Sequence, residues 1–270
     1  MAEPPKFARV TEIQEIAASV RQISLEMIEP TRLEYKPGQT VLLYAGFIDG
    51  KEVKRQYTLA SAPYEDDGRK LLLCVKLIPG GPASEYLGRL KVGDQVTLGG
   101  PIGKCTLSPE LTGDILFCIT GNGFAPVRGM LLSYFQKVVS SSFFDRVLGK
   151  VPKVRLLWSL KTEQDIFWQA EVLAPLLSKH KNFQYDLTLT QADASWKGKR
   201  GRLTTTAVQT AKALKTPTIF LIGNGAMIKD VRRRLEEEAK IPRDSILTEA
   251  FFTPKARGEG LIGTPPAGDA

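Results

Sequence analysis

The spacing of apolar residues changes along the chain, and in the first part apolar and polar positions alternate. Turn residues such as Pro37-Gly38 and Asp67-Gly68 separate the alternating runs. Alternation is typical of strands with one buried face, and short strands at this spacing favour a small antiparallel β-barrel. We expect strands at Phe7 to Ile16, Val20 to Met27, Thr40 to Phe47, Lys54 to Leu59, Leu71 to Ile78 and Gln95 to Leu98.

From about residue 113 the alternation gives way to continuous apolar runs, each followed by a helical pattern. Ile115 to Ile119 is wholly apolar, as expected of a strand that is buried on both faces. Strands that alternate with helices indicate βαβ units around a parallel sheet. We therefore expect a Rossmann-like domain with a five-stranded parallel sheet in the order 3-2-1-4-5. Its strands are expected at Ile115 to Ile119, Lys153 to Trp158, Gln184 to Leu189, Thr218 to Ile222 and Ser245 to Ala250, and its helices up to about Val139 and at Glu163 to Ser178, Leu203 to Ala213 and Ala226 to Ala239.

These two patterns predict two domains and a tail. The 270 residues are enough for two medium domains that each bury a core. Residues 1–110 are predicted to form the barrel domain, and residues 111–254 the α/β domain. Residues 140–152 look like an added loop, and residues 255–270 are rich in Gly and Pro and are expected to be disordered.

The net charge of +8 at pH 7 belongs to the second half of the chain. Residues 1–107 carry 14 Lys plus Arg against 13 Asp plus Glu, which leaves 23 against 16 for the rest. The chain has no basic stripe with interleaved aromatics and no nucleic-acid reader motif, so a nucleic-acid partner is not expected. Phosphate-bearing cofactors or an acidic protein would suit this charge, and a merely solvated basic face is the alternative.

Several classes of site and location are not expected. No segment has the roughly 18 consecutive apolar residues of a membrane helix, and the N-terminus lacks the features of a signal peptide, so we expect a cytoplasmic protein. Cys74, Cys105 and Cys118 are widely spaced, so they predict neither a zinc site nor an iron-sulfur cluster. His180 lies among lysines and is interpreted as solvated rather than catalytic.

One stretch of the barrel half combines a cation, an aromatic ring and a hydroxyl. Alternation along Arg55-Gln56-Tyr57-Thr58-Leu59 places the first, third and fifth side chains on one face and the other two on the opposite face. This array suits a ligand that is anionic at one end and flat and aromatic at the other. A core tyrosine beside a surface arginine is the simpler alternative when the stretch is taken alone.

Two glycine-rich turns of the α/β half follow the first and the fourth predicted strand. They are Gly121-Asn122-Gly123 and Gly223-Asn224-Gly225. Glycines let the backbone approach a pyrophosphate at a helix N-terminus, and in the order 3-2-1-4-5 both turns border one crevice. Either turn alone is equally compatible with an ordinary tight turn, but two at corresponding positions favour a dinucleotide site. A third turn, Gly80 to Leu87, begins a short helix that Ser84 could cap.

Taken in order, these motifs resemble the ferredoxin-NADP reductase superfamily. Arg55-Gln56-Tyr57-Thr58 resembles its Arg-x-Tyr-Ser/Thr flavin motif, and Gly121 to Pro126 resembles Gly-Thr-Gly-Ile-Ala-Pro. Further similar segments are Lys36 to Gln39 (Pro-Gly-Gln), Gly81 to Leu87 (Gly-x-x-Ser), Gly100 to Lys104 (Gly-Pro-x-Gly-Lys), Trp196 to Leu203 (Trp-x-Gly-x-x-Gly-Arg-Val) and Gly223 to Met227 (Cys-Gly-Pro-x-x-Met).

The resemblance implies FAD in the barrel, a nicotinamide nucleotide on the second domain, and hydride transfer between the two. It implies that Arg55 neutralises the FAD pyrophosphate beside the Ser84 turn, that Tyr57 stacks on the isoalloxazine, and that Thr58 hydrogen-bonds near flavin N5. The implied cofactor-binding residues are Arg55, Gln56, Tyr57, Thr58, Leu59, Val75, Gly81, Ala83, Ser84, Thr120, Gly121, Asn122, Gly123, Pro126, Gln191, Arg202, Gly223, Asn224, Met227 and Phe251.

The last predicted strand resembles the closing strand of the family. The resemblance implies that Glu249 lies near the hydride path or a proton route, and that Phe251 covers the flavin and must move before nicotinamide can stack. The implied catalytic residues are thus Thr58, Glu249 and Phe251, with no metal. An ordinary core strand is the alternative.

Two departures from the family pattern concern the nicotinamide end of the site. Ile222 stands where members usually have Cys, and Thr190-Gln191 stands where NADP-specific members commonly have Ser-Arg. An uncharged Gln191 cannot pair with a 2′-phosphate, which favours NADH over NADPH. Lys197, Lys199 and Arg200 are close enough in sequence to substitute.

The expected function is an FAD-dependent reductase that takes hydride from NADH or NADPH and passes single electrons to an acidic ferredoxin or flavodoxin, or runs in the reverse direction. The carrier is expected to be separate because the chain cannot build a cluster. Two alternatives are the reductase component of a multicomponent oxygenase, and a flavin subunit that exchanges electrons only within a larger redox complex.

Overall fold

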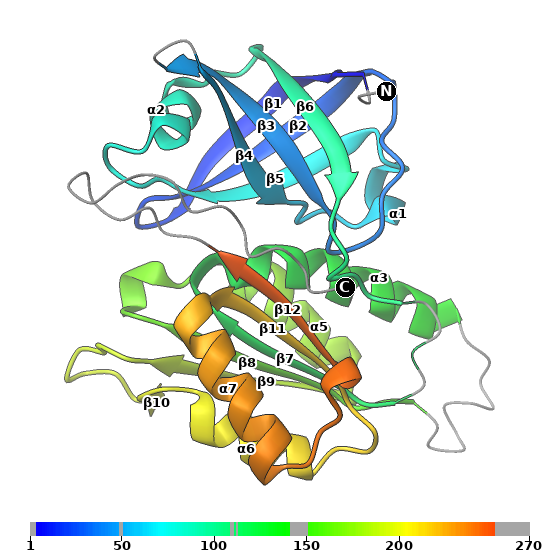
Figure 1. The fold of residues 1–270 in the computed structure, drawn as a ribbon, viewed down its shortest axis with the longest axis vertical. Coiled ribbons are helices and arrows are strands. Elements are labelled where there is room, and N and C mark those ends of the chain that lie inside the picture. Colours follow the sequence, from blue (N-terminus) through cyan, green and yellow to red (C-terminus); the bar gives the residue numbers. More distant parts are fainter. Residues whose placement is uncertain (1–3, 49–50, 109–110, 112, 141–150, 252–270) are drawn as a thin grey trace.

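The computed structural model describes residues 4–48, 51–108, 111, 113–140 and 151–251. The predicted loop at 140–152 lies mostly outside these residues, and the predicted tail at 255–270 lies wholly outside them. The predicted boundary between residues 110 and 111 adjoins residues that are not described, so the domain limits stay predictions. Two sheets, one above the other in Figure 1, make up the described part of the chain.

The first sheet is antiparallel, has six strands in the order β4-β3-β6-β1-β2-β5, and confirms the predicted barrel. An isolated bridge between Leu59 and Leu73 joins the chain after β4 to β5 and brings the two ends of the sheet together (Figure 1). Alternate residues point inward and form one apolar cluster. The elements are β1 (Lys6–Ala17), β2 (Val20–Glu29), β3 (Thr40–Ile48), β4 (Lys51–Thr58), α1 (Pro63–Asp66), β5 (Lys70–Lys76), α2 (Pro82–Arg89) and β6 (Gln95–Ile102).

The second sheet is parallel, with the order β10-β9-β8-β7-β11-β12. Five of its strands have the predicted order 3-2-1-4-5, but the prediction of five strands was wrong because β10 (Lys199–Arg200) adds a sixth at the edge. This strand has two exposed, basic residues and pairs through its backbone with Thr188 and Leu189, so it leaves no apolar pattern in the sequence. The other strands are β7 (Ile115–Thr120), β8 (Val154–Leu160), β9 (Phe183–Leu189), β11 (Thr218–Asn224) and β12 (Ile246–Phe251).

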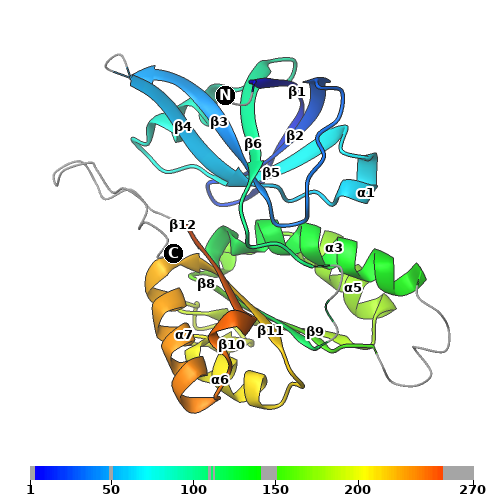
Figure 2. The same ribbon diagram turned by 45° about the vertical axis from the view of Figure 1, so that its right-hand side comes forward.

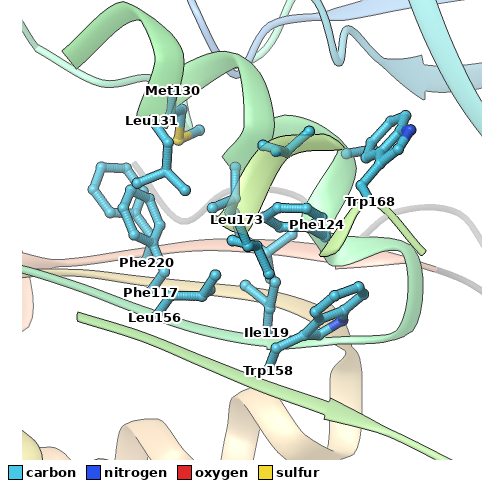
Figure 3. Packing of buried hydrophobic residues seen from close by; sticks show 14 of the residues in the cluster. Phe117, Ile119, Phe124, Met130, Leu131, Leu156, Trp158, Trp168, Leu173 and Phe220 are labelled. Carbon is cyan, nitrogen blue, oxygen red and sulfur yellow. The ribbon is translucent and has the colours of Figure 1, made fainter. Parts of the chain in front are cut away.

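Helices cover both faces of the parallel sheet (Figures 1 and 2). On one face, Phe117 of β7 lies in an apolar cluster with residues of α3 (Phe124–Ser140), as Figure 3 shows. On the other face, Leu116 packs with residues of α6 (Thr204–Lys212) and α7 (Gly225–Glu238). Neighbouring residues of β7 are therefore buried in opposite directions, which confirms the prediction for Ile115 to Ile119.

The helix expected at Glu163 to Ser178 is broken into shorter pieces. A 3-10 turn at Glu163–Asp165 is followed by Trp168 with φ +54° and a π-helix at Gln169–Leu173, and α5 (Ala174–Lys179) is regular. The reason is contact with the barrel: the Trp168 indole N–H donates to the Gln22 side chain of β2 at 2.9 Å. A tertiary contact of this kind outweighs the helical pattern.

Helix α3 fixes the parallel-sheet domain against the barrel. Arg128 donates to both carboxylate oxygens of Glu65, each at 3.0 Å, and to the carbonyl of Ala60 at 2.8 Å. The next residue, Gly129, lies so close that a Cβ there would be 2.5 Å from the carbonyl oxygen of Ser61. The segment that follows β4 thus rests directly on the first turns of α3.

We expect Gly129→Ala to lower the melting temperature by several degrees, because overpacking a tight contact costs about 1–3 kcal/mol. Gly88→Ala is the matched control, since Gly88 also lies in a helix but has nothing within 4 Å of its would-be Cβ. The control should leave the melting temperature unchanged or slightly higher because Ala favours helix. Thermal unfolding followed by circular dichroism checks both, and equal melting temperatures would contradict the close contact.

Candidate active site

A hydrogen bond between the two domains marks the site. Thr58, the last residue of β4, donates its hydroxyl proton to Oε1 of Glu249 on β12, 191 residues further along the chain. Thr58 also pairs with Thr40 at the start of β3, and their hydroxyl oxygens are 3.2 Å apart. Both threonines are buried. The structure therefore brings two barrel hydroxyls to one carboxyl of the other domain.

Burial dominates the electrostatics of Glu249. It raises the pKa of the Glu249 carboxyl to about 7, and hydrogen bonds from Thr58 and Thr40 oppose the rise in this pKa. The second oxygen, Oε2, is buried and has no hydrogen-bond partner within the described part of the chain. Ile222 is the paired residue on the neighbouring strand β11 and presents an apolar side chain beside it. A carboxyl in this setting can hold or release a proton near neutral pH.

Tyr57 and Arg55 lie on the same strand as Thr58. Tyr57 is half-buried against the apolar cluster of the barrel, and burial raises the pKa of its phenol to about 12, so its ring stays neutral. Arg55 is exposed, donates to the carbonyl of Lys54 at 2.8 Å, and has no carboxylate partner among the described residues. Gln56 is exposed on the opposite face. The strand thus offers a neutral ring and an available guanidinium two residues apart.

Two predicted site residues of the barrel have side chains that cannot face a ligand. Leu59 and Val75 are 0% and 1% exposed and belong to the apolar cluster of the barrel. Any contact that they make with a cofactor must come from their backbone groups. Their side chains maintain the barrel wall instead.

The turn before α2 is built differently from the prediction. Gly81 is the N-cap, with no side-chain cap, so the expected cap by Ser84 was wrong. The Ser84 hydroxyl instead accepts a hydrogen bond from the backbone N–H of Ile78 at 2.9 Å and closes the turn. The N–H groups of Ala83 and Ser84 lie in the first helical turn, where they have no partner inside the helix. This turn can therefore receive an anion.

The two glycine-rich turns of the second domain lie side by side. Strands β7 and β11 are neighbours, and the N–H of Asn224 donates to the Thr120 hydroxyl at 2.8 Å. Gly121 has φ +55° and an open position at its Cβ, while Gly123 and Pro126 are buried beneath the turn. The Nδ2 atom of the Asn122 side chain is buried and has no hydrogen-bond partner among the residues that the structure describes.

Asn224 has a structural task as well. Its Oδ1 accepts the N–H groups of Ala226 at 2.9 Å and of Met227 at 3.2 Å, so it caps α7. Phe251 is half-buried in register with Asn224 and lies on the same face of β12 as Glu249. The predicted residues of both turns and of the closing strand therefore meet at the carboxyl ends of β7, β11 and β12.

Gln191 and Arg202 lie further out, beyond the end of β9. Gln191 is exposed, and its N–H donates to the carbonyl of Lys161 at 2.8 Å. Arg200 donates to the carbonyls of Ala192, Asp193, Ala194 and Trp196, at 2.5 to 3.3 Å. Lys199 pairs with Asp186 at 2.7 Å. Arg202 and Lys197 are exposed and have no partner within the described residues.

The available groups fit FAD and a nicotinamide nucleotide. The guanidinium of Arg55, which has no carboxylate partner among the described residues, and the N–H groups in the first turn of α2 suit phosphates, and the Tyr57 ring suits a flat heterocycle. The buried Nδ2 of Asn122 and Oε2 of Glu249 are two polar atoms that a ligand can satisfy.

Thr40 is the site residue that the sequence reasoning missed. It directly follows the Pro37-Gly38-Gln39 turn, but nothing in the sequence shows that it pairs with Thr58. Strand register across the barrel is the missing information. The turn motif was the available signal, because it fixes where β3 begins.

Two family models match this chain in sequence order. The oxidoreductase FAD-binding domain matches residues 7–107, and the oxidoreductase NAD-binding domain matches residues 117–233. A protein of Sorangium cellulosum named ferredoxin-NADP reductase B is 30% identical over 92% of this chain and 98% of its own length. The chain belongs to the ferredoxin-NADP reductase superfamily.

Other similar proteins include a reductase component of propane 2-monooxygenase from Mycolicibacterium goodii, 27% identical over 90% of this chain and 68% of that protein. The solved structure of an Amycolatopsis cytochrome P450 reductase, GcoB, has a TM-score of 0.75 at 23% identity, over 92% of this chain and 70% of that one. The latter likeness supports the fold alone.

This reductase is therefore an oxidoreductase with an FAD-binding and an NAD-binding domain, as the motifs indicated. Its redox chemistry belongs to FAD and a nicotinamide nucleotide, and it takes part in electron transfer. Within the described ranges, no helix is both long and apolar enough to cross a membrane.

We expect Glu249→Gln to remove a pH-dependent part of the stability. With its pKa raised to about 7 from an ordinary 4.5, the native carboxyl keeps a proton that the unfolded chain releases. The free energy of unfolding of the wild type, relative to the variant, should thus fall by up to roughly 3 kcal/mol as the pH rises through this window.

Urea unfolding at several pH values provides this measurement. Glu26→Gln is the control, since Glu26 is exposed on β2 and its replacement should change stability by less than about 0.5 kcal/mol at each pH. A wild-type to Glu249→Gln difference that is constant across pH would contradict the buried carboxyl.

Proposed function

We propose that this reductase takes hydride from a reduced nicotinamide nucleotide and passes electrons singly to a separate redox protein. The observation that carries this proposal is the hydrogen bond between Thr58 of the barrel and Glu249 of the other domain. Bound FAD would accept the hydride and divide the electron pair, which no side chain can do. The protein positions the reactants and supplies protons and charge.

On the barrel side, Arg55 and the N–H groups of Ala83 and Ser84 bind the pyrophosphate, and Gly81 lets the backbone approach it. Tyr57 provides the stacking surface, and Thr58 the hydroxyl beside the reactive ring. The exposed guanidinium of Arg55, the half-buried ring of Tyr57 and the N–H groups of the first turn of α2 support these assignments. The remaining proposed contacts are Gln56 by its exposed side chain, and Leu59 and Val75 by backbone groups.

On the other side, the turns at Gly121 to Gly123 and at Gly223 to Asn224 bind the nicotinamide nucleotide. The hydrogen bond between Asn224 and Thr120 supports a single crevice between them. Phe251 lies two residues beyond Glu249 on the same face of β12 and would have to move for a bound nicotinamide to stack there. Further proposed contacts are Pro126, Met227, Gln191 and Arg202.

Glu249 holds or releases a proton at the boundary of the two domains. Its pKa, raised to about 7 by burial, supports both forms at neutral pH. Thr58 links this carboxyl to the barrel side of the site. Thr58, Glu249 and Phe251 are the three residues that we assign to the reaction itself.

We propose NADH as the donor in preference to NADPH. Gln191 has no charge for a 2′-phosphate, and Arg200 and Lys199, which follow it, are occupied by carbonyls and by Asp186. Lys197 is a flexible, strongly hydrated cation and is a weaker substitute for a rigid guanidinium. The engagement of Arg200 therefore removes one substitute for a charge at Gln191, and Arg202 is the guanidinium in this region that has no partner within the described residues.

The redox partner is proposed to be an acidic protein of the ferredoxin or flavodoxin type. Lys229, Arg232, Arg233, Glu236 and Arg243 line a hollow beside Ala250 of β12. Arg232 and Arg233 are paired with carboxylates, whereas the side chains of Lys229 and Arg243 have no partner within the described residues. Cations at this edge suit electrostatic steering of an acidic surface. The relatives that are reductase components of propane 2-monooxygenase favour an oxygenase partner as the second candidate.

Anaerobic reduction of the FAD-loaded protein tests the proposal. Addition of NADH should bleach the visible absorption of the flavin, and NADPH should do so less efficiently. Failure to retain FAD would refute the proposed function. Retained FAD that neither nucleotide reduces would instead favour a subunit that exchanges electrons only within a larger complex.

We expect Gln191→Arg to raise kcat/KM for NADPH by about tenfold, because a charge-assisted hydrogen bond to the 2′-phosphate is worth about 1.5–3 kcal/mol. Gln184→Arg adds the same charge at the opposite end of β9, on an exposed position, and should leave the preference unchanged. Steady-state kinetics with a dye acceptor gives both values. A wild-type protein that already prefers NADPH would overturn the assignment of NADH.

A further inference from the structure

Thr40 is buried at the centre of the site, and no motif of the sequence includes it. It is 5% exposed, begins β3, and its hydroxyl oxygen lies 3.2 Å from that of Thr58. We propose that Thr40 is a positioning residue whose hydroxyl hydrogen-bonds with both Thr58 and the Glu249 carboxyl and so keeps the Thr58 proton directed onto Glu249. The inference rests on the proposed function, because it concerns the same carboxyl.

The number of protons on the two hydroxyls supports this direction of the hydrogen bond from Thr58 to Glu249. A threonine hydroxyl has one proton to donate and two lone pairs to accept with. Thr58 gives its only proton to Oε1 of Glu249. In the 3.2 Å contact with Thr40, Thr58 therefore acts as the acceptor, and the single hydroxyl proton of Thr40 is shared between Thr58 and the Glu249 carboxyl, whose pKa is lowered by hydrogen bonds from both threonines. Without the Thr40 hydroxyl, Thr58 would lose this contact and the Glu249 carboxylate would lose one of its two hydroxyl partners.

Within the described residues, the hydroxyls of Thr40 and Thr58 are the groups that hydrogen-bond with the Glu249 carboxyl. Ile222 on β11 is apolar and wholly buried beside it. Cys105, which follows β6, is a titratable group that interacts electrostatically with Glu249. Burial, and to a lesser extent the charge of Glu249, raise the pKa of its thiol to about 12, so the thiol stays uncharged. No charged side chain contributes to the shift of the Glu249 pKa within the described residues. Among the described residues, Thr40 and Thr58 are thus the groups that counteract the rise in the Glu249 pKa caused by burial.

The consequence is a measurable effect on acidity. Hydrogen bonds from both hydroxyls stabilise the charged carboxylate and lower the pKa of Glu249. Removal of the Thr40 hydroxyl takes away one of these bonds, so the effect of burial on the pKa becomes larger. The pKa of the Glu249 carboxyl should then rise further. A role confined to barrel stability would lower the melting temperature but would not move this pKa.

The test is the pH profile of flavin reduction by NADH in FAD-loaded protein, measured anaerobically in single turnovers. Thr40→Val keeps the size of the side chain and removes the hydroxyl, and Thr40→Ser restores it. We expect the midpoint assigned to Glu249 to move up by about one pH unit in Thr40→Val. Thr40→Ser should keep the wild-type midpoint, and the apparent dissociation constant of NADH should change less than twofold in both.

Thr11→Val is the matched control, because Thr11 is a barrel threonine on β1 whose hydroxyl donates to the carbonyl of Ser24 at 3.2 Å, away from Glu249. It should leave the midpoint unchanged. Thr40→Ala is a second variant that removes the hydroxyl if Thr40→Val does not fold. An unchanged midpoint in a folded variant that lacks the hydroxyl, or an equal shift in Thr40→Ser, would overturn the proposal.

The Glu249→Gln variant distinguishes a failure of this inference from a failure of the proposed function. If flavin reduction in the wild type shows a midpoint that Glu249→Gln abolishes, the function stands and the Thr40 variants decide the inference. A wild-type protein that NADH and NADPH both fail to reduce would refute the proposed function itself. A profile without any midpoint that depends on Glu249 would overturn the inference while leaving nucleotide oxidation in place.

Discussion

The hydrogen bond from Thr58 to Glu249 is the contact on which the site depends, because its two partners belong to different domains. Its formation requires that the end of β4 and the end of β12 face each other. Helix α3 provides this alignment through the two hydrogen bonds of Arg128 to Glu65 and the close approach of Gly129 to Ser61. Packing at the domain interface thus determines the chemistry a few residues away.

Burial and hydrogen bonding act on Glu249 in opposite directions, and burial is the larger effect. The apolar side chain of Ile222, paired with Glu249 on the neighbouring strand, adds to the apolar surroundings of this carboxyl. At Tyr57 burial also outweighs an opposing effect, here the charge of Arg55, and raises the pKa of the phenol to about 12. The site therefore combines an uncharged flat surface, an available cation and one carboxyl that titrates near neutral pH.

The sequence predicted the parts of this structure that local pattern controls. Alternation located the six barrel strands, and the apolar run Ile115 to Ile119 located the central parallel strand. Long-range contacts produced the differences. Trp168 interrupts a predicted helix because it bonds to the barrel, and β10 pairs through its backbone with no apolar signal. Thr40 joins the site only through strand register, which a single sequence does not contain.

The most direct test of this account is the protonation of Glu249 in the intact protein. Infrared difference spectra across pH report the protonated carboxyl as a C=O band, and Glu249→Gln assigns that band. We predict a midpoint near pH 7 that moves upward when Thr58 is replaced by Val, because a hydrogen bond to the carboxylate is lost. A midpoint near the ordinary glutamate value of 4.5, unchanged in Thr58→Val, would contradict it.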